Sequence, residues 1–217
     1  MPAALYTVIG DLVGSRSVPD RRGVQRALTA ALDEVNRVVP VAQPFEPTVG
    51  DEYQGACATP SEAVQAALLV RLSLLPSIDV RCGIGHGTVT VHDADRAPLL
   101  QDGPGWWSAR AALQALDGRR DSARTWFDGP DQEAVNAFLL CRDQIVQRLN
   151  ERGIRILRLA LLGHQQKEIA SLEGIWPSAV SQQFSRNIGV VVESMRVFAA
   201  TTPAPEQAPH TVPRTAR

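Results

Sequence analysis

Short apolar runs alternate with helical apolar spacing along the first half of the chain. Continuous or alternating apolar positions predict strands, whereas apolar positions three and four residues apart predict helices with one buried face. The sequence therefore predicts elements in the order β-α-β-β-α-β-β, at residues 5–10, 21–38, 45–49, 53–58, 59–75, 79–84 and 88–92. Gly85-His86-Gly87 is predicted to turn the chain between the last two strands.

This order satisfies the ferredoxin-like βαββαβ plan with one added strand. We expect an α+β fold in which both helices cover one face of an antiparallel sheet. A helix at 106–116 and a last strand at 124–127 follow, and Gly129-Pro130-Asp131 is the best candidate domain boundary. Beyond it only helices are predicted, at 134–150, 152–162, 166–172 and 177–197.

Three parts are therefore expected along the chain. Residues 1–128 are predicted to form the α+β domain, and residues 129–200 an all-α domain. Residues 201–217 are rich in Pro, Thr and Ala and have almost no large apolar side chain. Such a segment buries too little surface to offset its ordering entropy, so we expect a disordered tail.

Composition narrows the class of protein without naming a partner. The chain has 217 residues, of which 44% are hydrophobic and 21% charged, as in ordinary globular proteins. Its net charge of -1 gives no global field for nucleic acid or membrane. Cys57, Cys82 and Cys141 form no Cys-x-x-Cys pair, so we expect buried free thiols. No apolar run approaches the ~20 residues that cross a bilayer, and no signal peptide is recognisable, so a cytoplasmic protein is expected.

Two carboxylates stand out at the ends of predicted strands. Gly10-Asp11 ends the first apolar run, and Gly50-Asp51 lies between two short predicted strands. The glycines leave the backbone open to a bulky anion. Two such carboxylates repel one another unless a cation lies between them, and Mg²⁺ is the usual cation where phosphate binds. We predict that Asp11 and Asp51 share a metal-nucleotide site; the alternative is that both are turn residues.

The helical half contains a pattern typical of a helix-turn-helix at 166–186. Ala170 is small where two helices cross, Gly174 follows at the turn, and Val180 is the apolar anchor of the second helix. The polar residues predicted to contact DNA are Lys167, Ser178, Ser181, Gln182, Ser185 and Arg186. The pattern is similar to that of many bacterial regulators, with Trp176 in place of a capping Ser or Thr.

Residues 141–200 carry eight Lys or Arg against five Asp or Glu, so this half is mildly basic. A single motif of this kind usually binds a two-fold DNA site as a dimer. We therefore expect a homodimer on double-stranded DNA. The alternative is an ordinary helical hairpin that packs on the first domain.

Four sequence blocks carry a family resemblance. They begin at Gly10-Asp11-Leu12-Val13-Gly14-Ser15-Arg16, Thr48-Val49-Gly50-Asp51-Glu52, Arg81-Cys82-Gly83-Ile84-Gly85 and Asp102-Gly103-Pro104, the last followed by Ala109-Arg110. Over residues 4–117 they resemble the SatD family. More distantly, they are similar to class III nucleotidyl cyclases and to the diguanylate cyclase palm. The cyclase resemblance implies Mg²⁺ or Mn²⁺ on Asp11 and Asp51 beside the Leu12 carbonyl. It also implies a purine nucleotide contacted by Gly14, Ser15, Arg16, Gly50, Glu52 and Arg110.

The chain departs from the cyclase pattern at two places. Pro47 stands where these enzymes have a base-selecting Lys, and Trp107 or Ser108 where they have a transition-state Asn. Loss of one oriented hydrogen-bond donor to the transition state raises the barrier by on the order of 3 kcal/mol, which would make a cyclase very slow. The resemblance therefore supports metal binding better than catalysis. Arg110 is the one candidate catalytic residue, approximately placed for the transition-state Arg.

The preferred hypothesis is a DNA-binding transcriptional regulator that senses a metal-bound purine nucleotide. The alternatives are an active purine nucleotidyl cyclase with atypical base recognition and a protein-interaction adaptor. Two further features stay open. His86 is either a general base or a turn histidine, and Trp106-Trp107 either stacks on a purine or packs in a core or a dimer interface.

Overall fold

The computed structural model describes residues 4–93, 100–119 and 121–201. The predicted tail therefore lies outside the described residues, apart from its first residue, Thr201. No helix within the described ranges is long and apolar enough to cross a membrane.

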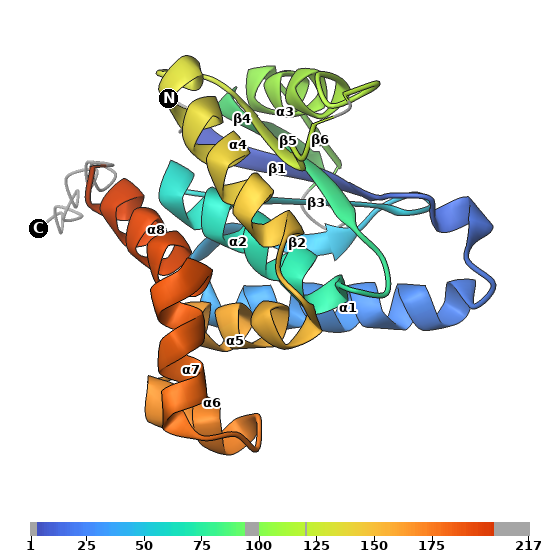
Figure 1. Cartoon of the computed structure of the whole chain (residues 1–217). Coiled ribbons are helices and arrows are strands. Elements are labelled where there is room, and N and C mark those ends of the chain that lie inside the picture. The colour runs from blue at the N-terminus through green and yellow to red at the C-terminus, as the bar shows by residue number, and fades with distance from the viewer. Residues whose placement is uncertain (1–3, 94–99, 120, 202–217) are drawn as a thin grey trace, which may run out of the picture.

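A five-stranded mixed sheet with the order β2-β3-β1-β4-β7 forms the centre of the molecule (Figure 1). Its strands are β1 (Ala4–Leu12), β2 (Val41–Pro47), β3 (Glu52–Cys57), β4 (Val80–Thr88) and β7 (Thr125–Asp128). The first four pair antiparallel, and β7 runs parallel to β4. The βαββαβ order is as predicted, but the added strand in this sheet is β7 at its edge and not the one predicted at 88–92. A separate two-stranded sheet holds β5 (Thr90–Asp93) and β6 (Leu100–Asp102).

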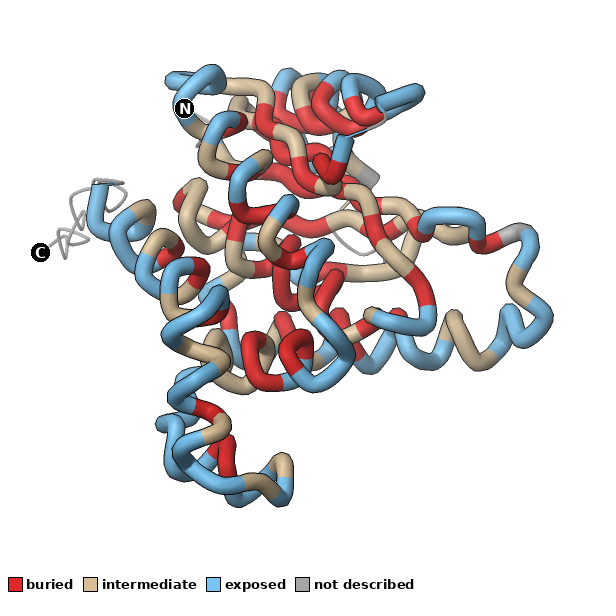
Figure 2. Tube along the Cα trace, in the orientation of Figure 1, coloured by how far each residue is buried: buried red, intermediate tan, exposed pale blue. Residues whose placement is uncertain are grey.

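Helices cover both faces of the sheet. Helices α1 (Arg21–Val38) and α2 (Pro60–Leu74) lie on the face that carries Val8 and Ile84, where their apolar sides form the main core (Figure 2). The start of α2 is fixed as predicted, because Thr59 and Glu62 form a reciprocal capping box. The opposite face carries Ile9 and packs against α3 (Pro104–Gln114) around a second, smaller core.

The prediction of a turn at Gly85-His86-Gly87 was wrong, because β4 continues to Thr88. Gly83, Gly85 and Gly87 occupy alternate positions on the face that meets α3. A Cβ atom on Gly85 would lie 2.1 Å from the Ala109 nitrogen, and one on Gly83 2.1 Å from the Ala109 carbonyl oxygen. These glycines do not bend the chain. They let the backbone of α3 lie directly on β4.

The C-terminal half is helical, as predicted. It comprises α4 (Gln132–Gln147), α5 (Glu151–Leu161), α6 (Gln166–Leu172), α7 (Pro177–Gln183), a π-helical turn η2 (Phe184–Ile188) and α8 (Gly189–Thr201). The helix expected at 177–197 is thus interrupted by η2. Helices α5 and α8 pack on α2, whereas α6 and α7 project away from the sheet (Figure 1). Leu139, Ile156 and Val191 belong to the same apolar core as α2, so buried contacts cross the predicted boundary near residue 129.

A buried charge network joins the sheet to α4. Asp143 is fully buried and accepts hydrogen bonds from Arg142 (2.8 Å) and Arg71 (3.4 Å). It also accepts from the backbone N–H groups of Arg124 (2.7 Å) and Thr125 (2.8 Å) in and beside β7. Arg71 of α2 makes a second ion pair, with Asp79 at 2.7 Å. Burial acts to raise the pKa of Asp79, but the hydrogen bonds and charge of Arg71, the Val80 backbone N–H and the charge of Arg124 together hold that pKa below its ordinary value.

The three cysteines do not behave alike. Cys57 and Cys82 are buried, and burial raises the pKa of each thiol to about 12. Cys141 is exposed, which corrects the expectation that all three would be buried. It lies on the outer face of α4, between the inward-facing Leu139 and Asp143.

We predict that Asp143→Asn lowers the free energy of unfolding by about 3–5 kcal/mol, because the buried Arg142 would lose its carboxylate partner and Arg71 would keep only Asp79. Urea denaturation at neutral pH measures the change. Glu193→Gln is the matched control: this carboxylate on α8 lies at the surface, and its loss should change the unfolding free energy by less than about 0.5 kcal/mol. Equal effects of the two substitutions would contradict a structural role for the network.

Candidate functional site

The two predicted carboxylates lie at the same end of the central sheet. Asp11, near the end of β1, is the register partner of Glu52 in β3 and of Arg81 in β4. The backbone N–H of Leu12 donates to the carbonyl of Asp51 at 3.3 Å. The strand pairing thus brings together the β1 end and the β2–β3 hairpin, which are 40 residues apart in sequence.

Arg81 forms a bidentate ion pair with the Asp11 carboxylate. Its Nε and Nη2 atoms donate to the two carboxylate oxygens at 3.1 and 2.6 Å, and its Nη1 donates to Asp117 at 2.8 Å. Hydrogen bonding to Asp11 raises the pKa of Arg81. The sequence hypothesis did not assign Arg81 to the site. Alternation along β4 places Arg81 on the face opposite the inward-facing Val80 and Cys82. The sequence does not give the register of β4 with β1, which is what places Arg81 beside Asp11.

A second bidentate pair lies beside the first. Arg110 of α3 donates to both carboxylate oxygens of Glu52, at 2.9 and 2.8 Å. Hydrogen bonding to Glu52 raises the pKa of Arg110. Two residues that were predicted to contact a nucleotide therefore contact one another. Both pairs keep part of their side-chain surface exposed: 28% and 20% for Arg81 and Asp11, and 43% and 33% for Arg110 and Glu52.

Two glycines shape the loops around these pairs. Gly14 has φ of 70° and Gly50 has φ of 77°, a region that side chains other than glycine rarely adopt. Between them the hydroxyl of Ser15 donates to the Asp51 carboxylate and fixes the β1 loop to the hairpin. The side chain of Arg16 lies outside the described part of the structure.

The side chains around Asp11 and Asp51 do not form a ready-made site for a divalent cation. Among the described residues, no group of three or more His, Cys, Asp or Glu side chains could hold a metal ion. Asp11 is already bound by a guanidinium and Asp51 by the Ser15 hydroxyl. In this arrangement the carboxylates do not fit a resident metal, because Arg81 supplies the positive charge next to Asp11.

The aromatic residues and His86 have structural contacts. Trp106 is 7% exposed in the second core, whereas Trp107 is 61% exposed and its indole N–H donates to Asp102 at 2.7 Å. His86 lies within β4 with its ring 4.6 Å from the ring of Tyr6, and burial lowers its pKa. His86 is therefore not a turn histidine. Neither the Trp107–Asp102 hydrogen bond nor the His86–Tyr6 ring contact involves a residue of the Asp11 end of the sheet.

The predicted DNA-contact residues lie on the projecting α6–α7 unit. Ile169, Ala170 and Val180 are buried between the helices, and Gly174 has φ of 63° in the turn between them. All six residues predicted to contact DNA are exposed, namely Lys167, Ser178, Ser181, Gln182, Ser185 and Arg186. Ser185 and Arg186 lie in η2 rather than in a regular α-helix. Trp176 is the N-cap residue of α7, forms no side-chain cap hydrogen bond and is 78% exposed.

These features define an α+β protein with a βαββαβ sheet, two arginine–carboxylate pairs at one sheet end and packed C-terminal helices. The chain belongs to the SatD family, whose sequence pattern matches residues 5–196. The family covers both the sheet and the C-terminal helices. No curated protein matches the chain.

Comparison with solved structures gives distant similarities. The catalytic core of a rhodopsin-guanylyl cyclase with converted specificity, in complex with ATPalphaS, is 19% identical, with a TM-score of 0.42 over 52% of this chain and 72% of that chain. Two structures of a bacterial light-regulated adenylyl cyclase are 12% and 13% identical, with TM-scores of 0.46 and 0.42. Each covers 58% of this chain, and the chain spans 43% of their length.

We predict that Arg81→Met raises the affinity of the protein for Mn²⁺ alone by about tenfold, because Asp11 loses its guanidinium and becomes free to bind a cation. Titration followed by electron paramagnetic resonance of free Mn²⁺ measures this. Arg119→Met is the control, since Arg119 pairs with Asp121 and with none of the carboxylates of the two bidentate pairs. Equal Mn²⁺ affinity in the wild type and the Arg81 variant would show that Arg81 does not compete with a metal.

Proposed function

We propose that the protein is a DNA-binding transcriptional regulator whose sheet end binds a purine nucleotide as effector. The observation that carries the proposal is the α6–α7 unit, which projects from the body of the molecule and exposes a polar face (Figure 1). Helices α1, α5 and α8 pack on α2, α3 packs on β4, and α4 packs on β7, so α6 and α7 are the described helices free to approach a large partner.

The composition of the exposed face supports DNA as the partner. Ser178, Ser181 and Gln182 offer hydrogen-bond donors and acceptors to base edges, and Arg186 offers a guanidinium to phosphate or guanine. Buried Val180 anchors the opposite side of α7. A π-helical turn often marks a functional position in a helix, and here it carries Ser185 and Arg186.

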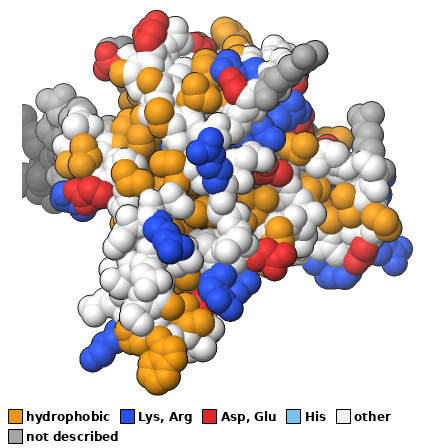
Figure 3. All heavy atoms as spheres, in the orientation of Figure 1, with side chains coloured by type: hydrophobic (Ala, Val, Ile, Leu, Met, Phe, Trp, Pro, Cys, Tyr) orange, Lys and Arg blue, Asp and Glu red, His pale blue; other side chains and the backbone are white. Residues whose placement is uncertain are grey.

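The free end of this unit supports a second candidate, a protein-interaction adaptor. Leu172 and Trp176 are 61% and 78% exposed, and Figure 3 shows hydrophobic side chains at this end of the molecule. Exposed aromatic side chains are frequent at protein interfaces. The two candidates differ in whether DNA binding depends on the polar face of α7.

The paired guanidiniums support a phosphate-containing effector. Arg110 and Arg81 form bidentate pairs with carboxylates, and phosphate accepts the same bidentate geometry. A nucleotide phosphate would take over Arg110 and Arg81 and release Glu52 and Asp11. A divalent cation would then enter with the nucleotide rather than reside in the protein beforehand, with Asp11 and Asp51 as its ligands.

The packing offers a route between the two sites. Helix α2 contacts β1 and β3 on one side and α5 and α8 on the other, and α8 continues from α7 through η2. A ligand shifts this arrangement only if it binds two states with different affinity. In a homodimer, such a shift would change the distance between the two α7 helices and so the fit to a two-fold DNA site.

We predict that ATP or GTP binds in the presence of Mg²⁺ and that Arg110→Met weakens binding about tenfold or more, because one bidentate phosphate contact is lost. Isothermal titration calorimetry measures the affinity, and Arg37→Met at the exposed end of α1 is the control. Absence of binding by both nucleotides would contradict the effector proposal. Steady formation of a cyclic product that is lost in Asp51→Asn would instead assign the protein to the nucleotidyl cyclases.

We predict that the protein binds DNA from upstream of its own gene and that Arg186→Ala weakens binding about tenfold and lowers the salt slope by about 1. Fluorescence anisotropy across a salt series measures both quantities. Arg196→Ala is the control, because Arg196 lies on α8 paired with Glu193 at 2.7 Å. If the wild type binds no DNA, or if both variants bind it equally, DNA recognition by α7 is wrong and the adaptor is favoured.

A further inference from the structure

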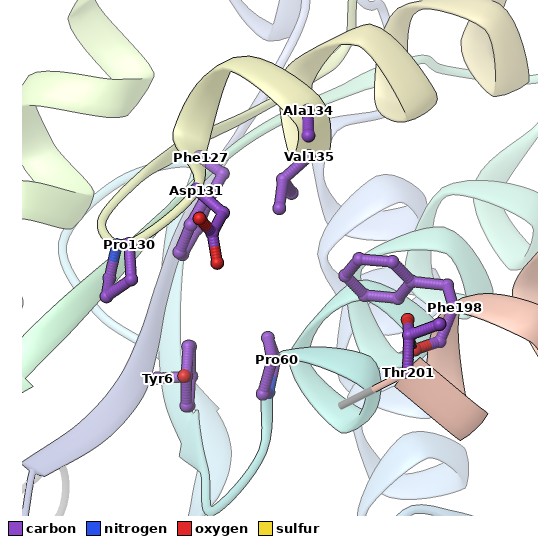
Figure 4. A pocket seen from close by; sticks show the side chains of 9 residues that line it. All are labelled: Tyr6, Pro60, Phe127, Pro130, Asp131, Ala134, Val135, Phe198 and Thr201. Carbon is purple, nitrogen blue, oxygen red and sulfur yellow. Dashed lines mark hydrogen bonds between the residues drawn. The ribbon is translucent and has the colours of Figure 1, made fainter. Parts of the chain in front are cut away.

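A cavity of about 510 Å³ lies between the sheet and the last helix, away from the arginine–carboxylate pairs. Its lining residues come from β1, β7, α2, α4 and α8, namely Tyr6, Pro60, Phe127, Asp131, Val135 and Phe198, with Pro130, Ala134 and Thr201 at the rim (Figure 4). Tyr6 and Asp11 are five positions apart on β1, hence roughly 17 Å apart and on opposite faces of the sheet. None of the residues proposed for DNA or nucleotide lines this cavity.

The walls of the cavity are aromatic and held in place. The ring of Tyr6 lies 6.2 Å from that of Phe127 and 4.6 Å from that of His86. The ring of Phe198 stacks on Phe138 at 5.0 Å. Aromatic faces of this kind stabilise a cation or an apolar group placed against them.

Asp131 supplies the single charged side chain among the lining residues. It occupies the cap position of α4, where aspartate commonly accepts a backbone hydrogen bond, yet its side chain makes no such bond. Its carboxylate points into the cavity instead (Figure 4). The backbone of Asp131 has φ of 55°, the one positive φ outside glycine in the described part of the chain. No Lys or Arg within that part is paired with it.

The neighbouring titratable groups leave the cavity with one negative charge. Burial and then the charge of Asp131 raise the pKa of Tyr6, so its hydroxyl stays protonated at neutral pH. Burial lowers the pKa of His86, which is therefore neutral at that pH. Thr201 donates its hydroxyl to the Phe198 carbonyl at 2.9 Å and keeps its oxygen as an acceptor.

We propose that this cavity is a binding site for a small organic monocation, an amine or quaternary ammonium with an apolar body. The cationic head would pair with Asp131 and the apolar body would lie between the rings of Tyr6, Phe127 and Phe198. The volume is within the ~300–1,000 Å³ typical of small-molecule sites. A ligand bound there contacts the sheet, α4 and α8 at once. The site goes beyond the proposed function and does not depend on it.

Saturation-transfer NMR and calorimetry on the full-length protein test the proposal with three probes: 2-phenylethylamine, benzyltrimethylammonium and cyclohexylmethylamine. At least one cation should bind, and the neutral 2-phenylethanol should bind about tenfold more weakly or not at all. Asp131→Asn should weaken the cation about tenfold. Asparagine tolerates positive φ, so this variant should keep its melting temperature. Glu133→Gln, an exposed carboxylate in the first turn of α4 that does not line the cavity, should leave affinity unchanged.

Ala134→Phe is the second variant, because it fills the rim of the cavity and keeps Asp131. Loss of binding in this variant supports occupation of the cavity, whereas unchanged binding places the cation elsewhere and overturns the proposal. Failure of all three cations to bind overturns it as well. So does equal affinity of the wild type and Asp131→Asn, or of 2-phenylethylamine and 2-phenylethanol.

Discussion

The buried ion network around Asp143 is the interaction on which the rest of the arrangement depends. Asp143 accepts two backbone hydrogen bonds from Arg124 and Thr125, and this fixes β7 to α4. The same carboxylate accepts from Arg71, which places α4 relative to α2. Arg142 donates to Thr125 as well, at 2.6 Å, and its buried Nη1 atom has no hydrogen-bond partner among the described residues. Such a network adds little net stability compared with an apolar core, but any other packing would leave charges buried and unpaired.

This constraint explains why the C-terminal helices are not an appendage. With β7 and α4 fixed, the chain returns over α2, and α5 and α8 bury Ile156, Leu157 and Val191 in the core that the sheet began. Arg158 of α5 adds an ion pair with Glu34 of α1 at 2.5 Å. Helices α6 and α7 project from the body of the molecule, although their buried Ile169, Ala170 and Val180 continue the same core (Figure 2). A change at the sheet therefore has a packed route to the helices that carry the proposed DNA contacts.

The sequence predicted local structure well, because local signals decide it. The helical apolar spacing predicted helices at 21–38 and 59–75, close to the observed α1 (Arg21–Val38) and α2 (Pro60–Leu74). The glycines of β4 were misread as a turn, because glycine allows both a turn and close approach of a helix. Which of these applies depends on α3, which lies about twenty residues later.

The candidate site shows the same limit. Asp11 and Asp51 lie at the same end of the sheet, because β1 pairs with β3, but the metal-nucleotide site that the sequence predicts for them stays a prediction. Their immediate partners, Arg81 and Ser15, depend on strand register and loop conformation, which no local pattern specifies. Asp131 was noted only as part of a boundary, because its role depends on residues from five different elements.

The molecule thus holds two kinds of ion pair with different consequences. Asp143 and Arg142 have no exposed side-chain surface, so no ligand can exchange with either of them without unfolding the region. Arg81, Asp11, Arg110 and Glu52 remain partly exposed. Ion pairs of that kind contribute only about 0–1 kcal/mol, because water screens them and holds the released groups well. Under the proposed function, a phosphate that offers both guanidiniums equal hydrogen bonds would replace the carboxylates at little cost in hydrogen bonding, and the accompanying cation would offset the repulsion between the phosphate and the released Asp11 and Glu52. The exposed pairs are suited to exchange with a ligand, while the buried network keeps the surrounding fold in place.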